Sequence, residues 1–332
     1  MKGLVVLFLG ILTMTSFCGQ AQKYVSVKRS LKLMGSTFEL TVVANNEDIG
    51  YINLQEAIAE IKRIENLISS WDPDSETSEI NRNAGVKPVK VSLELYKLIE
   101  RSIQISEITN GAFDITIAAM EEVWKFDGSM TTLPTPEQIR SAVSKVGYKK
   151  IALNKAENTV FLTEKGMKIG FGAIGKGYAA DKVRELLVSK QVPAGMINAS
   201  GDITTWGTKA TGEKWLIGVD HPRRNGKIFT WLPLIESSVS IAGNPDRYVS
   251  FNGKKYAHYI DPESGYPTTG ISKVTVLAKR AELCDALATA VYILGKEKGI
   301  SLINQLGDTE VIIVDRFNQM FNSNGIILDT LE

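Results

Sequence analysis

Two hydrophobic periodicities, one typical of helices and the other of strands, interleave irregularly along this chain of 332 residues. Apolar residues that recur every three or four positions predict helices at residues 54–68, 92–109, 177–190 and 281–294. Apolar alternation and short apolar runs predict strands at residues 37–42, 215–219, 237–242, 255–260 and 273–278. The order of these elements lacks the regular βαβ repeat of a parallel sheet, so we predict an α+β fold with mixed sheets and packed helices.

Local sequence signals add further elements to this order and mark no boundary between domains. Thr135, followed by Pro136 and by Gln138 at the third position after it, predicts a helix with a capping box and a proline in its first turn. Residues 71–85 are predicted as a polar loop, and residues 148–163 as a hairpin. Because no Pro-, Gly- or Ser-rich linker interrupts the chain, we expect residues 22–332 to form a single domain with two lobes.

The composition narrows the class of protein. The chain carries 38 Lys and Arg against 37 Asp and Glu, a formal net charge of +1. Such a balance provides no large basic field for a polyanion, so we expect no nucleic-acid partner. The two cysteines, Cys18 and Cys284, lie far apart in sequence and lack the close spacing of a structural zinc site. A disulfide framework and a structural zinc are therefore excluded.

The N-terminal residues have the order of a secretory signal. Lys2 precedes an apolar run at residues 4–14, and small and polar residues follow up to Ala21. The run is too short to cross a bilayer. We therefore predict a signal peptide at residues 1–21 and an exported, periplasmic mature chain. A lipoprotein attached to the membrane through Cys18 is the alternative, but the bulky Phe17 stands where the lipid-modifying peptidase prefers a small residue, so simple export is favoured.

A glycine-rich segment at residues 170–177 satisfies two nucleotide-binding patterns in part. A Rossmann unit requires an acidic residue about twenty positions later, where residues 191–195 contain none. A P-loop requires Ser or Thr after the lysine, where this chain has Gly177. The two patterns nevertheless share one physical feature, which this segment keeps. Backbone N–H groups at the start of a helix, together with the charge of Lys176, can bind an anion such as a pyrophosphate. A tightly packed strand-to-helix turn explains the segment equally well.

The helix predicted at residues 281–294 is apolar almost throughout. Asp285, Thr289 and Tyr292 are exceptions that share one face, because they are spaced at i, i+4 and i+7. Two oxygen donors at that spacing suit Mg²⁺ or Ca²⁺, with carbonyls, phosphates or water completing the shell. A structural ion pair between Asp285 and a Lys or Arg is the alternative, and it is the commoner fate of a lone buried carboxylate.

Imidazole chemistry is restricted to two residues, His221 and His258. His258 ends a predicted strand before a proline-rich turn, a position that commonly faces a cleft, whereas His221 stands in a polar loop. The GxSxG spacing of a serine hydrolase is absent from residues 195–201. Residue type alone leaves open whether His258 is a general base or a hydrogen-bonded structural residue.

Six ordered segments together resemble the ApbE family of flavin transferases, and the resemblance covers nearly the whole mature chain. The segments are Met34-Gly35-Ser36; residues 67–75 with Glu79-Ile80-Asn81; residues 110–114; residues 172–181; residues 258–262 with Gly265-Tyr266-Pro267; and residues 284–290 with Leu294-Gly295. The resemblance implies an ApbE-like fold in which two lobes enclose a flavin-nucleotide cleft. It also implies an FAD:protein FMN transferase with FAD as substrate and Mg²⁺ as cofactor. Such an enzyme passes the FMN moiety to a threonine hydroxyl of an exported flavoprotein and releases AMP.

The same resemblance implies roles for individual residues. His258 and Lys176 are the expected catalytic residues, His258 as the base for the acceptor hydroxyl and Lys176 near the phosphates. The metal is expected to be held by Asp285, Thr289 and the backbone carbonyl of Ala173. Contacts to FAD are expected from His258 and Lys176, from Asp181 near the adenosine half, and from Met34, Trp71, Ala112, Phe113 and Asp114.

Departures from the family's pattern concern the phosphate region. Gly170 replaces an aspartate before the glycine-rich segment, and Ser200 replaces the first of two glycines before Asp202. Ile241 and Ala242 replace a Thr-Ser pair. Because these hydroxyls are lost, a non-catalytic FAD-binding protein is one alternative. An FAD pyrophosphatase, which uses water in place of the acceptor and releases FMN and AMP, is the other, because both reactions need the same site.

Overall fold

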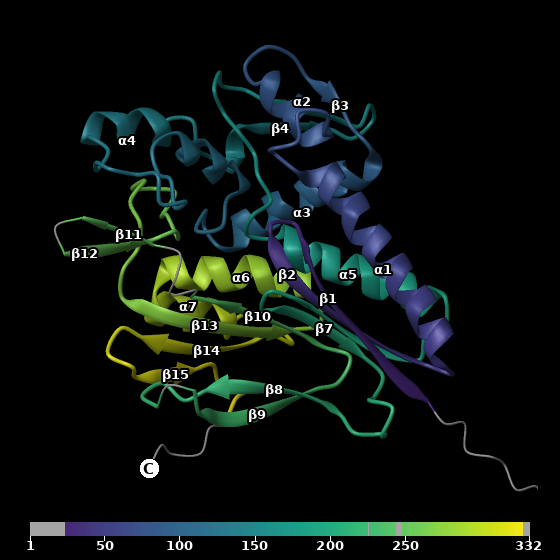
Figure 1. Cartoon of the computed structure of the whole chain (residues 1–332). Helices are drawn as coiled ribbons and strands as arrows, with labels where there is room; N and C mark the ends of the chain where they lie inside the picture. Colours follow the sequence, from purple (N-terminus) through teal and green to yellow (C-terminus); the bar gives the residue numbers. More distant parts are fainter. Residues whose placement is uncertain (1–23, 225, 244–247, 252, 328–332) are drawn as a thin grey trace, which may run out of the picture.

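The computed structural model of the chain describes residues 24–224, 226–243, 248–251 and 253–327 (Figure 1). The predicted signal peptide and Cys18 lie outside these ranges. Within them, no helix combines the length and the apolar character that crossing a membrane requires.

A sheet of eight described strands forms one layer of the molecule (Figure 1). The strands follow the order β1 (Val25–Leu33), β2 (Ser36–Ala44), β6 (Ala194–Ala199), β7 (Asp202–Trp206), β10 (Ser238–Ala242), β13 (Ile271–Ala278), β14 (Glu310–Asp315) and β15 (Met320–Asn322). Every pairing between these strands is antiparallel, so the α+β class is confirmed, whereas the expectation of mixed sheets is wrong in this detail. The physical reason is that short turns join β1 to β2, β6 to β7 and β14 to β15, and only antiparallel neighbours can be joined so closely.

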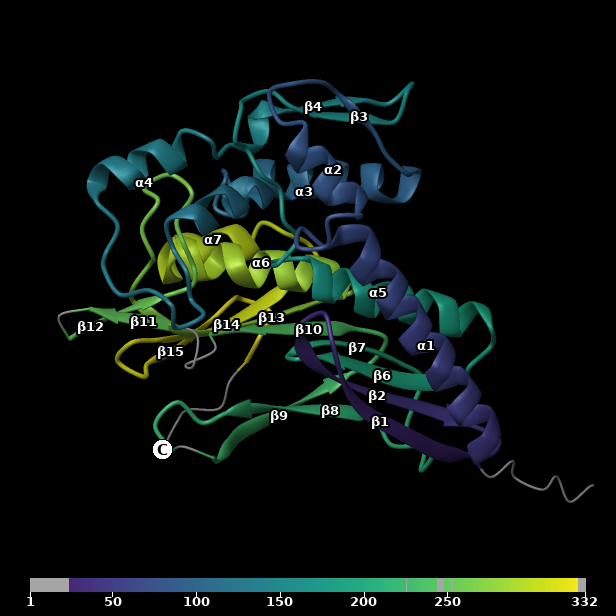
Figure 2. The same cartoon turned by 45° about the horizontal axis from the view of Figure 1, so that its top comes forward.

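Three helices cover one face of this sheet, namely α1 (Glu47–Ile68), α5 (Gly175–Ser189) and α6 (Ala281–Leu294) (Figures 1 and 2). Leu54 and Ile61 of α1 and Val183 of α5 are buried with Phe38 and Leu40 of β2 in one cluster. These side chains recur at helical spacing on α1 and at alternate positions on β2, so one face of α1 is buried against one face of β2. A further helix, α7 (Lys296–Ile303), follows α6 and packs against it.

A smaller layer lies across α6 from the large sheet (Figure 2). It contains α2 (Glu76–Arg82), α3 (Leu93–Ile108), α4 (Pro136–Val143), the 3₁₀ helices η1 (Ile115–Glu122) and η2 (Tyr148–Lys150), and a sheet in the order β3 (Val89–Lys90), β5 (Thr159–Leu162) and β4 (Ile151–Asn154). Two hairpins complete the described fold. One pairs β8 (Trp215–Asp220) with β9 (Ile228–Leu234), and the other pairs β11 (Tyr248–Phe251) with β12 (Lys254–Ala257).

The apolar composition of α6 follows from its position between the two layers. Leu287 and Val291 are buried in a cluster with side chains of β13 and β14. Ala286 and Ala290, on another side of the helix, are buried in the core of the smaller layer. A helix that is apolar on nearly all sides is a buried helix, so each polar residue on it needs a separate explanation.

Sequence signals place most helices correctly. The predicted helices at residues 92–109, 177–190 and 281–294 correspond to α3, α5 and α6, with ends that differ by two residues at most. The capping box is present, because Thr135 Oγ1 accepts the Gln138 N–H at 3.3 Å and Gln138 Oε1 accepts the Thr135 N–H at 2.8 Å. The loop predicted at residues 71–85 contains α2, whose start is capped by Ser75. That prediction was wrong because seven residues are too few to show a clear helical period.

Helices α5 and α6 cross in close contact at Gly177. A Cβ atom built on Gly177 would overlap the backbone oxygen of Ala281. Only glycine lets α6 approach the first turn of α5 this closely. The contact also explains physically why the glycine-rich segment is not a P-loop, since the Ser or Thr that a P-loop requires at this position would collide with α6.

Each of these two helices caps the other. Neither α5 nor α6 has a side-chain hydrogen bond from its own N-cap residue. Asp181 of α5 accepts the N–H groups of Ala281 and Glu282 at 3.0 Å each, and Asp285 of α6 accepts the N–H of Gly177 at 3.2 Å. These bonds satisfy N–H groups that a helix start leaves without partners, and they place a carboxylate at the positive end of each helix dipole.

We expect Gly177→Ala to lower the free energy of unfolding by about 1–3 kcal/mol or more, because the new methyl group forces α5 and α6 apart. Gly172→Ala is the matched control, since it is the same change in the same segment and a Cβ there meets no atom within 4 Å. Urea unfolding followed by circular dichroism measures both variants. Equal stability of the two would contradict the close crossing.

Candidate active site

The glycine-rich segment contacts both layers as it leads into α5. The Gly170 N–H donates to the Ile115 carbonyl of η1 at 2.9 Å. A Cβ on Gly175 would lie 2.8 Å from Ile68 Cδ1 of α1 and 3.8 Å from Met34 Cε. The segment therefore lies where η1, the end of α1 and the turn between β1 and β2 meet, with Met34 beside the start of α5.

Three charged side chains meet at the start of α5. Lys176 makes its direct ion pair with Asp202 of β7, and its Nζ lies 3.8 Å from Oδ2 of Asp285 on α6. Ser240 of β10 donates a hydrogen bond to Asp202 Oδ1 at 2.5 Å. Both aspartates are buried, and the Lys176 side chain is 26% exposed. We call Lys176, Asp202 and Asp285 the charge cluster.

When fully ionised, the charge cluster carries one more negative than positive charge. Burial and the charge of Asp202 raise the pKa of Asp285 to about 7. Burial lowers the pKa of Lys176, but the charges of Asp285 and Asp202 outweigh this effect and hold that pKa above its usual range. Lys176 is therefore protonated near neutrality, and a divalent cation beside Asp285 would offset the unfavourable ionisation of its buried carboxyl.

The donor atoms near Asp285 suit a hard divalent cation. Thr289 lies one turn further along α6, and its hydroxyl makes no hydrogen bond within the described part of the chain. Ala173 stands two residues before α5, whose Gly177 N–H contacts Asp285. No group of three or more His, Cys, Asp and Glu side chains among the described residues is arranged to hold a metal, so hydroxyl, carbonyl and phosphate oxygens are needed as well. Such an oxygen set fits Mg²⁺.

The structural ion pair considered as the alternative for Asp285 is only partly present. Lys176 approaches Asp285 to 3.8 Å, but its direct partner is Asp202. Lys176 is thus shared between the two carboxylates, with Asp202 the nearer, and the metal role of Asp285 stays a prediction.

His258 follows β12 and reaches the same region through a row of aromatic rings. Its ring centroid lies 4.1 Å from that of Tyr259, which stacks on Tyr292 of α6 at 3.9 Å. The Tyr259 hydroxyl accepts the N–H of Gly243 at 2.8 Å, and burial raises its pKa to about 12. Because Tyr292 shares a helix face with Asp285, the fold brings His258 to the side of α6 that carries Asp285 and Thr289.

Trp71, an expected flavin contact, lies in the loop after α1 with 80% of its surface exposed. The Ser69 hydroxyl accepts its backbone N–H at 3.2 Å. The neighbouring Ser70 lies beside the glycine-rich segment, since its Oγ is 3.7 Å from a Cβ built on Gly170. Trp71 therefore follows a residue that lies beside the segment and has ring surface available for stacking, and its contact with FAD stays a prediction.

The remaining expected FAD contacts have buried side chains that serve the fold. Ala112 and Phe113 belong to the core of the smaller layer. The Asp114 carboxylate caps η1 and accepts three hydrogen bonds of 2.6 to 2.8 Å. Asp181 caps α6. Any contact of these carboxylates with FAD is additional to these bonds, and it too stays a prediction.

Sequence reasoning missed Asp202, the direct partner of Lys176, and Ser240, which donates a hydrogen bond to Asp202. Asp202 and Ser240 are directly paired across the neighbouring strands β7 and β10. The signal that could have found Asp202 is an acidic residue at the start of an otherwise uncharged strand that is buried along its whole length. Ser240 has no such signal, because small polar residues are ordinary on strands.

The residues that depart from the family's pattern fit their immediate surroundings in this structure. A Cβ at Gly170 would lie 3.0 Å from the Cβ of Ala118, so η1 packs tightly where the family has an aspartate side chain. Ser200 has a φ of 59°, in the left-handed region that favours the family's glycine. Ala242 is buried at the end of β10.

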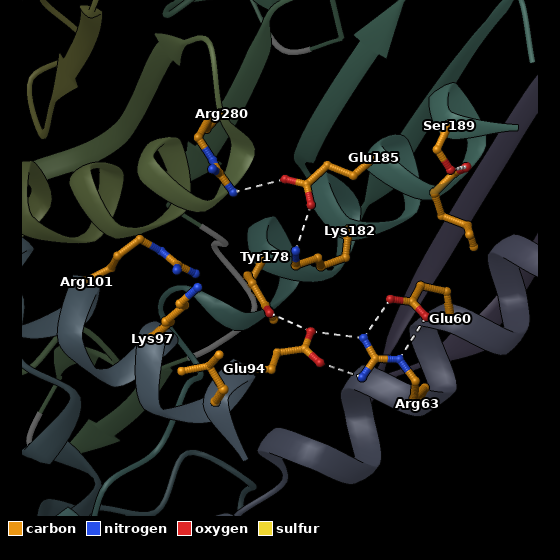
Figure 3. Close-up of a pocket in the computed structure, with 12 residues that line it drawn as sticks. Glu60, Arg63, Glu94, Lys97, Arg101, Tyr178, Lys182, Glu185, Ser189 and Arg280 are labelled. Carbon is orange, nitrogen blue, oxygen red and sulfur yellow. Dashed lines mark hydrogen bonds and ion pairs between the residues drawn. The ribbon is translucent and has the colours of Figure 1, made fainter. Parts of the chain in front are cut away.

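A cavity of about 700 Å³ opens between α1, α3, α5 and the start of α6 (Figure 3). Its carboxylates already have partners, because Glu94 accepts from Arg63 and from the Tyr178 hydroxyl at 2.7 Å each, and Glu185 lies 2.7 Å from Lys182. Arg63, Lys97, Arg101, Lys182 and Arg280 line the cavity as well, but no member of the charge cluster does. Because the charge cluster is not part of its lining, the nucleotide is not assigned to this cavity, whose polar contacts join α1 to α3 and α3 to α5.

Comparison with known proteins identifies the family. The model of the ApbE family matches residues 34–313, a region that includes every expected site residue. The chain belongs to the ApbE family. The FAD:protein FMN transferase of Treponema pallidum (strain Nichols) is 29% identical over 289 residues, which cover 82% of this chain and 80% of the relative. The FAD:protein FMN transferase of Klebsiella pneumoniae (strain 342) is 30% identical, with 86% and 88% covered.

The ApbE fold is also found by structural comparison. The crystal structure of the ApbE protein of Thermotoga maritima matches this chain with a TM-score of 0.83 and 28% sequence identity. The match covers 91% of this chain and 98% of that chain. The ApbE-like fold predicted from the ordered segments is therefore confirmed.

We expect the ionisation of Asp285 to oppose folding of the metal-free chain as the pH rises from about 4 to about 7. The raised pKa of Asp285 means that in this interval the folded chain holds a proton that the unfolded chain has released. Asp285→Asn, which has no carboxyl group to ionise, should lack this contribution, so its stability relative to the wild type should rise across the interval. Thermal unfolding of both proteins across this pH range measures the difference.

Mg²⁺ provides a second readout of the same site. Saturating Mg²⁺ should raise the Tm of the wild-type chain above about pH 7, where the carboxyl is ionised, and should have much less effect on Asp285→Asn. An equal rise of Tm in both proteins would place the cation elsewhere.

Proposed function

We propose that this chain transfers the FMN moiety of FAD to a threonine hydroxyl of an exported flavoprotein, releases AMP and depends on Mg²⁺. The observation that carries the proposal is the charge cluster, in which Lys176 lies beside two buried carboxylates at the start of α5. The relatives named FAD:protein FMN transferase support the same activity.

Transfer of a phosphate-linked group depends mainly on positioning and on neutralising charge. Asp202 holds the protonated Lys176 beside the glycine-rich segment, where its charge can neutralise an oxygen of a pyrophosphate. Asp285, Thr289 and the backbone carbonyl of Ala173 would hold Mg²⁺, which supplies a second positive charge to the pyrophosphate. In this proposal the chain holds positive charges next to the pyrophosphate and forms no covalent intermediate.

In the proposed reaction one bond forms and one breaks. The threonine oxygen attacks the phosphorus of the FMN half, the bond from this phosphorus to the bridging oxygen breaks, and AMP leaves with that oxygen. The hydroxyl proton passes to a ring nitrogen of His258. The position of His258 supports this role, because Tyr259 and Tyr292 connect it to the face of α6 that carries Asp285.

An FAD pyrophosphatase remains the second candidate, because water in place of the threonine uses the same charges and the same base. A non-catalytic FAD-binding protein is less well supported, since a binding protein has no need of a lysine and a carboxylate arranged beside potential metal donors. Product analysis separates the three functions.

The first experiment incubates residues 22–332 with FAD, Mg²⁺ and a threonine-containing domain of an exported flavoprotein. We expect AMP and an acceptor heavier by one FMN in equal amounts. Asp285→Ala and removal of Mg²⁺ by EDTA should each abolish both products. AMP with free FMN, formed equally without the acceptor, would establish the hydrolase, and bound FAD without either product would establish the binding protein.

His258→Asn should lower kcat for transfer by about 10²–10⁴-fold, because a general base contributes about that much. The variant should still bind FAD. His221→Asn is the matched control, since among the described residues Nδ1 of His221 accepts only the N–H groups of Arg223 and Arg224 in the turn after β8. Transfer kinetics of both variants are compared with the wild type. Full activity of His258→Asn, or equal losses in the two variants, would contradict the assigned role.

We also propose that the chain is exported by the signal peptide at residues 1–21. The order of Lys2, the apolar run and Ala21 supports export. A mass measurement on protein made in its native host tests this, because a mature chain that begins at Gln22 indicates simple export and a lipid on Cys18 indicates the lipoprotein.

A further inference from the structure

We propose that the outer face of the β8–β9 hairpin docks this protein on an anionic lipid surface. The proposal is independent of the transferase activity. It combines an apolar strip on the hairpin with exposed cations in the turn that joins the two strands.

The register of the hairpin sorts its side chains onto two faces. Cross-strand partners share a face, and successive pairs alternate between faces. Trp215 and Leu234 are one such pair, and both are buried against the large sheet. The opposite face carries the pairs Leu216 with Pro233 and Gly218 with Trp231.

This outer face is apolar and exposed. Leu216 is 46% exposed, Ile228 41% and Trp231 58%. A Cβ on Gly218 would lie 2.7 Å from Ile228 Cδ1, so Ile228 covers the glycine that stands opposite Trp231. Exposed side chains of this size, gathered on one face, mark an interaction surface. We call Leu216, Ile228, Trp231 and Pro233 the apolar strip.

The nucleotide site does not account for the exposure of Trp231. Of the five tryptophans, Trp124, Trp206 and Trp215 are buried. Trp71 is exposed, but it belongs to the expected FAD contacts. Indole rings are enriched at the boundary between membrane and water, where one side of the ring is apolar and its N–H remains wet.

The turn of the hairpin adds positive charge beside the apolar strip. Arg223, Arg224 and Lys227 are exposed, and none of the three makes an ion pair with another described residue. Asp220, the cross-strand partner of Ile228 and the nearest acidic residue in sequence, is 58% exposed and pairs with Lys273 at 2.5 Å, which balances its charge. Apolar side chains next to cations without partners match the acyl boundary and the anionic headgroups of a lipid surface.

The hairpin also lies where docking leaves the site accessible. Its buried residues pack on Val43 and Val239, whereas Val42, the neighbour of Val43 on the opposite face of β2, packs toward α1 and α5. The hairpin and the helices therefore cover opposite faces of the large sheet (Figures 1 and 2). A protein held by the apolar strip would direct α5 and α6 away from the lipid.

Vesicle sedimentation tests the proposal with residues 22–332, which include every described element. We expect binding to vesicles of phosphatidylcholine with phosphatidylglycerol, weakening with salt, and little binding to phosphatidylcholine alone. Trp231→Ser and the double variant Arg223→Ser/Arg224→Ser should each lower the affinity about fivefold or more. Lys87→Ser/Lys97→Ser, which removes the same charge from two exposed residues of the smaller layer, should leave the affinity unchanged.

Tryptophan fluorescence identifies the residue that enters the lipid. A blue shift on adding the anionic vesicles should disappear in Trp231→Ser and persist in Trp71→Ser, which controls for the loss of an exposed indole. A folded chain that releases AMP from FAD but does not bind anionic vesicles would overturn the proposal and leave the transferase intact. A dimer that Trp231→Ser dissociates, without vesicle binding, would assign the apolar strip to a second copy instead.

Discussion

The crossing of α5 and α6 at Gly177 is the contact on which the candidate site depends. Because Gly177 has no side chain, the starts of the two helices approach closely enough for Asp181 and Asp285 each to cap the other helix. The approach that allows Asp285 to cap α5 also places it 3.8 Å from Lys176. The helix packing, the two caps and the charge cluster therefore all depend on the absence of a side chain at Gly177.

The charge cluster is better explained by function than by stability. Buried charges gain little net stability even when paired, and two carboxylates beside one lysine leave an uncompensated charge. A core that served packing alone would be expected to replace them with apolar residues of similar volume. The presence of Asp285 on α6, a helix otherwise apolar on nearly all sides, beside Lys176 of α5 and Asp202 of β7 indicates a site whose balance of charge is completed by a ligand.

Sequence patterns predicted those parts of the fold and site that depend on local periodicity. The polar face of Asp285, Thr289 and Tyr292 was visible because i, i+4 and i+7 spacing is a property of one helix. Asp202 was not visible as the partner of Lys176, nor Ser240 as the partner of Asp202, because these contacts join residues 26 and 38 positions apart. Likewise, the capping of α6 by Asp181 joins residues 100 positions apart, which no local pattern encodes.

The burial of α6 between the two layers also determines which parts of the molecule can move. A helix packed on both sides exchanges its amide hydrogens only when much of the domain opens, so it belongs to the most protected cooperative unit of the fold. Asp285 and Thr289, which we propose as metal donors, therefore belong to this protected unit. Any movement that admits an acceptor protein therefore has to occur in segments outside that unit. The β11–β12 hairpin and the residues around His258, which follow it, are such segments.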